Sequence, residues 1–308
     1  MNREMLYNDL SGFLAMHFPC KVQKISINAG FTCPNRDGNK GWGGCTYCNN
    51  ASFNPDYCRE VEGITRQLEE GIRFFDAKYQ GQKYLAYFQA YSNTYASLEV
   101  LKSRYEEALA HPKVVGLVIA TRPDAVNEEI LDYIAGLSKH CYVCMEYGVE
   151  SVNERVLETI HRRHSYREAE WAICATAERG IYVGAHLIFG LPGETKESML
   201  EGAVRLGNLP LHVLKLHQLQ IIKDTVMAEE YARNPEKFQL YSVYDYLDFV
   251  VEVIGKLCPE VYLERFVNQS PPEYLIAPNW RVKNFEFVAL LDKKLEEKDV
   301  WQGKYRNI

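Results

Sequence analysis

Three cysteines in a glycine-rich loop are the residues of this chain best suited to chemistry. Cys33, Cys45 and Cys48 stand in the run Cys33-Pro-Asn-Arg-Asp-Gly-Asn-Lys-Gly-Trp-Gly-Gly-Cys45-Thr-Tyr-Cys48. Thiolates gathered on a flexible loop can converge on one soft metal centre. Three protein ligands leave one coordination position open, which is typical of a catalytic metal site and not of a closed structural one. The loop therefore predicts a metal centre to which another molecule binds directly.

The simplest alternative for these thiols is a structural zinc site, with Cys58 as the fourth ligand. Cys141 and Cys144 also have the spacing of half a metal site. They fall within an expected strand, where positions 141 and 144 point to opposite faces, so we interpret both as buried core thiols. The remaining cysteines are interpreted as core or surface thiols: Cys20, Cys174 and Cys258.

Length and composition limit the class of protein. The chain has 308 residues, 47% of them hydrophobic, enough for one α/β barrel-sized domain or two smaller ones. Its formal net charge of -6 gives no global attraction to nucleic acid. Nine cysteines, an odd number in a chain of this size, suit a reduced cytosol better than a secreted disulfide scaffold. We find no signal peptide and no apolar stretch that could span a bilayer, and expect a cytoplasmic protein without a membrane partner.

Strand-like and helix-like segments alternate along the chain and set the expected fold class. Strands are expected at 22–29, 84–90, 114–120, 141–149, 182–189 and 213–222. Helices are expected between them, with Asn127 as one cap and capping boxes at Ser151-x-x-Glu154 and Ser165-x-x-Glu168. Six β–α units in series imply a parallel sheet with right-handed crossovers. We therefore predict an α/β fold, a partial (β/α)6 barrel of the TIM type.

The unusual loops all follow expected strands, at the edge where such barrels carry their chemistry. They are the cysteine loop and residues 89–94, 121–124, 148–151 and 190–194. On the sixth strand Lys215 and His217 alternate with leucines, so they are expected to point into the barrel or its mouth, where a buried lysine needs a partner. Beyond Pro259 the pattern becomes irregular and ends in a charged helix at 282–297. The expected domains are 1–258, the barrel with its loop at 33–48, and 259–308, an extension packed on it.

Five further motifs follow the cysteines in order: Thr121-Arg122-Pro123-Asp124, Gly148-Val149-Glu150-Ser151, Arg163-His164, Gly190-Leu191-Pro192-Gly193-Glu194 and Lys223-Asp224-Thr225. With them the chain resembles the radical S-adenosylmethionine (SAM) superfamily. More narrowly it resembles the YhcC-like group, related to the radical SAM domain of the elongator catalytic subunit. Eleven residues separate Cys33 from Cys45, in place of the superfamily's usual three, a widened form found in the elongator-related branch.

The resemblance implies a [4Fe–4S] cluster held by Cys33, Cys45 and Cys48, with SAM chelating the fourth iron. One electron into the cluster would cleave SAM to methionine and a 5′-deoxyadenosyl radical that abstracts hydrogen from a substrate. Such a protein supplies orientation and exclusion of water, while the cofactor supplies the chemistry. An electron donor such as flavodoxin or ferredoxin is implied as a partner.

Contacts to SAM are implied position by position. Tyr47 matches the aromatic residue against the adenine, and Ile188 and Gly190 match the strand-five segment whose backbone meets it. Glu150 matches a polar contact to the ribose or methionyl part. Arg163 matches the basic residue that pairs with the SAM carboxylate, for which a planar bidentate donor is apt.

One part of the family pattern is missing. Where the superfamily carries Gly-Gly-Glu to hold the SAM ammonium, this chain has Phe88-Gln89-Ala90-Tyr91-Ser92-Asn93-Thr94. Gln89 or Ser92 is the expected replacement. Simpler interpretations remain beside these roles: Glu150 as a helix cap, and the Arg163 cluster as basic residues at a helix end, with Arg162 as a surface charge.

The substrate is not written in the motifs. RNA modification, a small metabolite and a protein substrate all remain open, and no broad basic surface supports RNA. Lys215 is a candidate for a substrate-side or SAM-side contact, and Tyr91 and Tyr95 lie in a mouth loop. The alternatives from other classes are a non-catalytic iron–sulfur protein for electron transfer or sensing, and a zinc-stabilised binding module.

Overall fold

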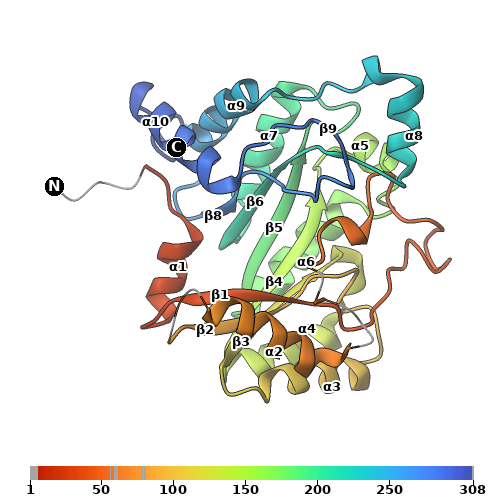
Figure 1. Cartoon of the computed structure of the whole chain (residues 1–308), viewed down its shortest axis with the longest axis vertical. Coiled ribbons are helices and arrows are strands. Elements are labelled where there is room, and N and C mark those ends of the chain that lie inside the picture. Colours follow the sequence, from red (N-terminus) through yellow and green to blue (C-terminus); the bar gives the residue numbers. More distant parts are fainter. Residues whose placement is uncertain (1–5, 56, 59–61, 78, 80, 307–308) are drawn as a thin grey trace.

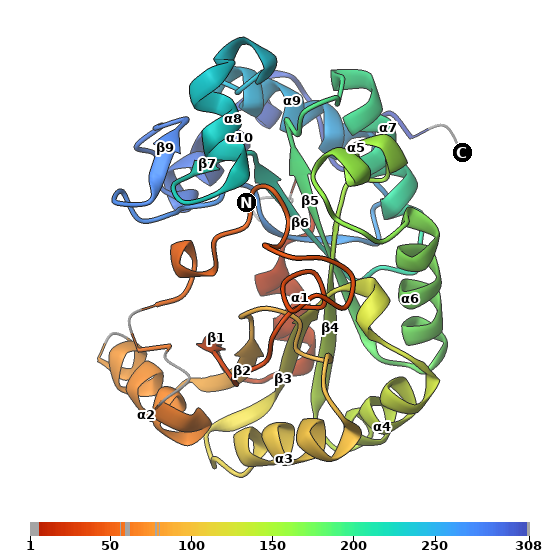
Figure 2. The same ribbon diagram turned by 90° about the vertical axis from the view of Figure 1, so that its right-hand side faces the viewer.

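A curled parallel sheet forms the centre of the molecule. The computed structural model describes residues 6–55, 57–58, 62–77, 79 and 81–306. Within these ranges seven parallel strands form one sheet, in the order β1 (Val22–Ile27), β2 (Lys83–Phe88), β3 (Val114–Thr121), β4 (Tyr142–Glu150), β5 (Tyr182–Phe189), β6 (Val213–Gln218) and β8 (Tyr262–Arg265). The sheet curls into a half-barrel with helices around its outside (Figures 1 and 2). The predicted α/β partial barrel is confirmed.

The crossover helices cover the outer face of the sheet: α2 (Gly63–Asp76), α3 (Leu98–Leu109), α4 (Glu128–Ser138), α6 (Tyr166–Glu178), α7 (Lys196–Gly207) and α9 (Val243–Lys256). The Asn127 side chain accepts from the Ile130 N–H at 2.9 Å and caps α4 as predicted. Ser165 and Glu168 form the predicted capping box of α6. The other predicted capping box is wrong: Asn153 caps the short helix α5 (Glu154–Thr159), because Ser151 directly follows β4 and donates its hydroxyl to Glu194.

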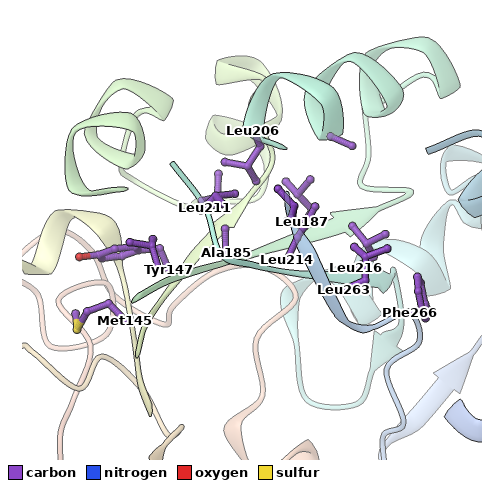
Figure 3. Packing of buried hydrophobic residues seen from close by; sticks show 14 of the residues in the cluster. Met145, Tyr147, Ala185, Leu187, Leu206, Leu211, Leu214, Leu216, Leu263 and Phe266 are labelled. Carbon is purple, nitrogen blue, oxygen red and sulfur yellow. The ribbon is translucent and has the colours of Figure 1, made fainter. Parts of the chain in front are cut away.

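Strand residues alternate between two different surroundings. Those that point outward join one large apolar core beneath the helices. Figure 3 shows part of this core, with Met145, Tyr147, Ala185 and Leu187 from neighbouring strands and Leu206 from α7. The continuous apolar runs of the central strands are therefore explained by burial on both faces of the sheet.

Residues that point inward near the strand starts meet the N-terminal helix α1 (Leu10–His17). The Phe13 ring packs edge-on against Tyr182, with ring centroids 5.4 Å apart, and lies 4.9 Å from the Tyr262 ring. With Leu14 and Leu85 it belongs to a second, smaller apolar cluster inside the half-barrel. Helix α1 thus fills the barrel interior at the amino-terminal ends of the strands. Space for a ligand therefore lies at their carboxyl ends.

The C-terminal part differs from the prediction in two ways. The expected strand at 213–222 is divided, since β6 ends at Gln218 and β7 (Ile221–Ile222) pairs antiparallel with β9 (Leu275–Ala277). In addition, β8 extends the sheet beyond β6, although no strand was predicted after 222. The strand was missed because it is four residues long and carries Glu264 and Arg265 in place of an apolar run. The remaining helices are α8 (Val226–Arg233) and α10 (Asn284–Glu297), and short 3-10 turns lie at Asn50–Ser52, Pro123–Ala125 and Pro235–Lys237.

In the ranges that the structure describes, no helix combines the length and apolar character needed to cross a membrane.

Candidate functional site

A cavity of about 250 Å³ lies at the carboxyl edge of the half-barrel. The cysteine loop, the loops after β2, β3 and β4, and the inner faces of β5 and β6 contribute to its wall. In Figure 2 the orange-red segment that carries the cysteines crosses in front of the curled sheet. The cavity therefore stands where parallel β/α barrels hold their ligands.

All three cysteines of the loop line this cavity. The loop is tied down by backbone hydrogen bonds: the Gly44 N–H donates to the Asn35 carbonyl at 2.8 Å, and the Cys48 N–H donates to the Cys45 carbonyl at 3.0 Å. It is also joined to the segment between α5 and α6, where the Asn35 amide donates to the His161 carbonyl at 2.7 Å. These bonds fix thiols from distant loop positions on one wall.

Two donors lie close to the buried Cys45 sulfur. The Asn35 Nδ2 is 3.5 Å and the Arg162 Nη1 3.6 Å from Cys45 Sγ. For Cys48, burial and then the neighbouring Cys45 raise the thiol pKa to about 11, although Arg36 acts in the opposite direction. The Arg36 guanidinium also donates to the Cys48 carbonyl at 2.7 Å. Donors close to these sulfurs stabilise negative charge on them, which is what metal-bound thiolates require.

The chemistry of the donor set, three thiols on one cavity wall, fits an iron–sulfur cluster. Among the described residues no three histidine, cysteine, aspartate or glutamate side chains are close enough together to hold one metal ion. In a cluster each thiolate binds its own iron, so three thiols spread over one cavity wall suit it. Cys58, the fourth ligand of the zinc alternative, is buried beside Tyr57 and outside the cavity wall, and burial raises its pKa to about 12.

The structure separates the two neighbouring arginines of the basic cluster in a way opposite to the prediction. Arg162, expected to be a surface charge, is buried and lines the cavity, whereas Arg163 is exposed and does not line it. The backbone explains the difference, since Arg163 adopts a left-handed conformation with φ of 58°. Arg163 instead lies against the outside of the cysteine loop, where a Cβ on Gly41 would come within 2.5 Å of its Nε.

Arg162 is held by groups on three sides. It donates to the Gly148 carbonyl, and its Nε donates to His164 Nε2 at 2.9 Å. Burial and the charges of Arg162 and Arg122 lower the His164 pKa to about 3, so the imidazole is neutral and can accept. The Arg162 Nη2 lies 3.5 Å from Glu150 Oε1. A Cβ on Gly148 would lie 2.5 Å from Glu150 Oε1 and 2.6 Å from Arg162 Nη2, so a larger residue there would displace both side chains from their present positions.

Of the other predicted SAM contacts, most lie on the cavity wall and one does not. Tyr47, Gln89, Ser92, Glu150 and Ile188 line the cavity. Gly190 adopts φ of 93° and lies outside the wall, where its N–H donates to Met199 Sδ at 3.0 Å.

The two expected replacements for the missing Gly-Gly-Glu differ in their surroundings. Gln89 Oε1 already accepts from the Ser26 hydroxyl at 2.8 Å. The Ser92 hydroxyl oxygen is buried and has no hydrogen-bond partner among the described residues. Since buried polar groups are normally paired, Ser92 has an unused position for a ligand in this cavity.

Arg122 was quoted in a motif, but no role was assigned to it. It is buried and binds Asp124 with two hydrogen bonds, of 2.8 and 2.9 Å. Burial alone would raise the Asp124 pKa, but Arg122 and then Lys40 lower it to about 2. Because Lys40 belongs to the cysteine loop and lies 2.6 Å from Asp124, this group fastens the loop to β3. The Arg-Pro-Asp sequence after a strand was the signal that could have identified it.

Fold and site together define the class of the protein: an α/β half-barrel with three thiols and a buried arginine on one cavity at its carboxyl edge. The model of the Radical SAM superfamily matches residues 30–203, and that of the Radical_SAM C-terminal domain matches residues 211–297. The chain belongs to the radical SAM superfamily, and the resemblance seen in its motifs is confirmed.

Relatives of similar length narrow the position within the superfamily. YtqA of Bacillus subtilis (strain 168) is 34% identical over 304 residues, which cover 99% of this chain and 94% of that protein. YhcC of Escherichia coli (strain K12) is 34% identical over 301 residues, 97% of this chain and 96% of the relative. The YhcC-like group is therefore the appropriate subdivision.

Solved structures support the same fold. The archaeal Methanocaldococcus infernus Elp3 with an N-terminal deletion matches with a TM-score of 0.66 at 17% identity, over 91% of this chain. This chain spans 64% of that structure. Methylornithine synthase (PylB) matches with a TM-score of 0.52 at 10% identity, over 92% of this chain and 83% of its own.

Proposed function

We propose that this protein is a radical SAM enzyme, which cleaves SAM reductively at a [4Fe–4S] cluster and passes the radical to a substrate. The observation that carries the proposal is that Cys33, Cys45 and Cys48 line the same cavity as the buried Arg162. Superfamily membership supplies the reaction class, and the cavity supplies a place for it.

The three cysteines would hold the cluster, and when bound it supplies the electron that cleaves SAM to methionine and a 5′-deoxyadenosyl radical. Arg36, Asn35 and Arg162 would stabilise negative charge on the thiolate sulfurs through the donors that already lie beside them. Enclosure by the cysteine loop would keep water away from a reactive species.

The remaining wall would orient SAM. We assign the carboxylate contact to Arg162 in place of Arg163, because Arg162 lies on the cavity wall and a guanidinium binds a carboxylate with two parallel hydrogen bonds. Ser92 would accept from the SAM ammonium with its unpartnered hydroxyl, and Glu150 would contact the ribose or methionyl part. Tyr47 and Ile188 would lie against the adenine.

An electron donor such as flavodoxin or ferredoxin belongs to this proposal, because the reaction consumes one electron. An RNA substrate receives less support. A tRNA uridine(34) acetyltransferase of Dehalococcoides mccartyi is 24% identical, but the match covers only 39% of that protein. The net charge of -6 also gives no general attraction to RNA.

The test is anaerobic reconstitution with iron and sulfide, reduction with dithionite in the presence of SAM, and quantification of 5′-deoxyadenosine. We expect product from the wild type and none from Cys45→Ala. Cys174→Ala is the matched control, because Cys174 lies on the outer helix α6 and should leave activity unchanged.

Two other results would refute the proposal. A cluster that assembles and accepts an electron without consuming SAM would indicate an electron-transfer or sensor protein. A colourless protein that contains zinc and no iron would indicate a metal-stabilised binding module.

A further inference from the structure

The inner face of the half-barrel carries a layer of charged side chains below the cysteine loop. Glu146 on β4 is at the centre of this layer: it accepts from Lys24 on β1 and from Lys215 on β6, each at 2.6 Å, and His186 Nε2 lies 3.2 Å away. Glu264 on β8 lies 2.6 Å from Lys24 and 3.2 Å from Lys215. The layer therefore joins the two edge strands β1 and β8 across the open side of the sheet.

Filling the barrel does not require charges at this level. One layer further toward the strand starts, the same interior is filled by Phe13, Leu14 and Leu85. Replacing buried ion pairs by apolar side chains of similar volume is often neutral or stabilising, so ion pairing alone is a weak reason for this layer. The backbone also makes room for it, since a Cβ on Gly184 would lie 3.1 Å from Glu146 Cγ.

The layer is part of the wall of the candidate active-site cavity. Tyr87, Glu146, His186 and Lys215 line the cavity, as do the three cysteines. A molecule in this cavity therefore meets the thiol loop at one end and the charged layer at the other.

The charges of the layer and of the neighbouring Arg265 do not balance. Lys24, Lys215 and Arg265 are three cations, Glu146 and Glu264 are two carboxylates, and one positive charge is left over. Both carboxylates are bound to the lysines. Among the described residues no carboxylate forms an ion pair with Arg265, which lines the cavity and remains exposed.

A buried polar atom without a partner lies on the same cavity wall, within the electrostatic reach of this arginine. His217 also lines the cavity, and its Nδ1 is buried without a hydrogen-bond partner among the described residues. Burial lowers the His217 pKa well below its usual range, and His186, Arg265 and Lys215 lower it further. The imidazole is therefore neutral, and the charges that act on it come from Arg265 and Lys215 and, with opposite sign, from Glu146.

We propose that Arg265 and His217 form an anion-binding subsite that anchors a carboxylate of the enzyme's small-molecule substrate. A single excess positive charge matches one monoanion, and a guanidinium matches the two oxygens of a carboxylate. Lys215 and Glu146, which are already paired, form the polar floor beside it. That the anchored molecule is a substrate rests on the proposed function. Binding of an anion at Arg265 and His217 is a property of the folded chain and does not depend on it.

The experiment measures binding and not turnover. Full-length protein with its reconstituted, oxidised cluster and bound SAM is titrated with acetate, with acetamide as the uncharged analogue of the same shape, and with inorganic phosphate. Binding to the wild type is followed through the Nε–H resonances of ¹⁵N-labelled arginine, with the Arg265 signal identified by its absence in Arg265→Gln. In the wild type and in every variant it is also followed through the ring resonances of ¹⁵N-labelled histidine, with the His217 signal identified by its absence in His217→Asn. Arg281→Gln is the matched control, because Arg281 is an exposed arginine of the same C-terminal region outside the cavity wall.

We expect acetate to shift the Arg265 signal with a dissociation constant in the millimolar range, and acetamide to have no effect. In Arg265→Gln acetate should bind at least about tenfold more weakly, a loss of ~1.4 kcal/mol, with Arg281→Gln unchanged. Arg265→Lys, which keeps the charge but loses the fork, should fall between the two.

The subsite would be overturned by equal binding of acetate and acetamide, by unchanged binding in Arg265→Gln, or by no acetate binding. If phosphate binds more tightly than acetate, the subsite recognises a phosphate group, and the proposal that it anchors a carboxylate is overturned. Failure of the proposed function is seen separately, as absence of 5′-deoxyadenosine from a protein that still binds acetate at Arg265.

Discussion

Glu146 is the residue whose replacement tests the charged interior of the barrel most directly. Its carboxylate is buried, and burial alone would raise its pKa. Lys215 and Lys24, each at 2.6 Å, nevertheless lower that pKa well below its usual range. Glu146→Gln keeps the shape of the side chain but leaves Lys215, among the described residues, with Glu264 at 3.2 Å as its one paired carboxylate.

Breaking one partner of a buried ion pair costs about 3–5 kcal/mol, because the other charge stays buried without compensation. Lys24 keeps Glu264 at 2.6 Å, so we expect a loss at the lower end, about 3 kcal/mol in the free energy of unfolding. That is a large part of the 5–15 kcal/mol typical of a folded domain. The double variant Glu146→Gln with Lys215→Met removes the stranded charge, so it should be more stable than Glu146→Gln alone.

Urea unfolding followed by circular dichroism measures these differences. Glu252→Gln is the matched control, since Glu252 pairs with Lys196 at 2.5 Å while both side chains are largely exposed. Such a surface pair contributes ~0.2–1 kcal/mol. The reasoning is refuted if Glu146→Gln lowers the free energy of unfolding by no more than the surface control does. It is also refuted if adding Lys215→Met to Glu146→Gln lowers the free energy of unfolding as much as Lys215→Met does in the wild type.

Three further predictions concern the cavity wall and the loop that covers it. Gly148→Ala should weaken SAM binding, measured by calorimetry, because its Cβ would displace Arg162; Gly136→Ala, where a Cβ meets open space, should leave binding unchanged. Arg162→Met should weaken SAM binding about tenfold to a hundredfold, as expected for a charge-assisted hydrogen bond, whereas an equal loss in Arg163→Met would contradict the assignment. Asp124, with a pKa of about 2, should contribute about 2 kcal/mol of stability that is present above pH ~4 and lost as the pH falls towards 2; the difference in urea midpoint between wild type and Asp124→Asn should shrink over that window, and a constant difference would contradict it.

Prediction from sequence worked best where a single hydrophobic pattern extended over a whole segment. The strand at 182–189 is found with both its expected ends, because Tyr182–Phe189 is apolar enough to be recognised and is bounded by glycines on both sides. β8 was missed because its inward residue Glu264 is charged and is paired with Lys24 and Lys215, which come from strands far away in the chain. A pattern within one segment contains no information about such partners.

The candidate site shows the same limit at the level of single residues. All three cysteines of the loop line the cavity. This was predictable because a loop that follows a barrel strand lies at the carboxyl edge, where the cavity is. The burial of Arg162 and the exposure of Arg163 were not predicted because the two are neighbours of identical type, and the left-handed backbone at His161 and Arg163 decides which one turns inward. Backbone conformations of this kind are set by the surrounding tertiary structure and are rare enough in arginine that sequence alone does not predict them.

The position of Arg265 follows from an irregularity of the same type and has a functional consequence. The register between β6 and β8 shifts between Leu214 and Lys215, so that Lys215 pairs with Arg265 and not with Glu264. Because side chains alternate along a strand, a regular β8 could present only one of these two neighbours to the interior. The shift lets Glu264 neutralise the lysines and Arg265 reach the cavity at once. An edge strand can tolerate such a bulge more easily than a central strand. The unpaired positive charge of Arg265 therefore lies on a strand where a residue selected for substrate binding destabilises the fold least.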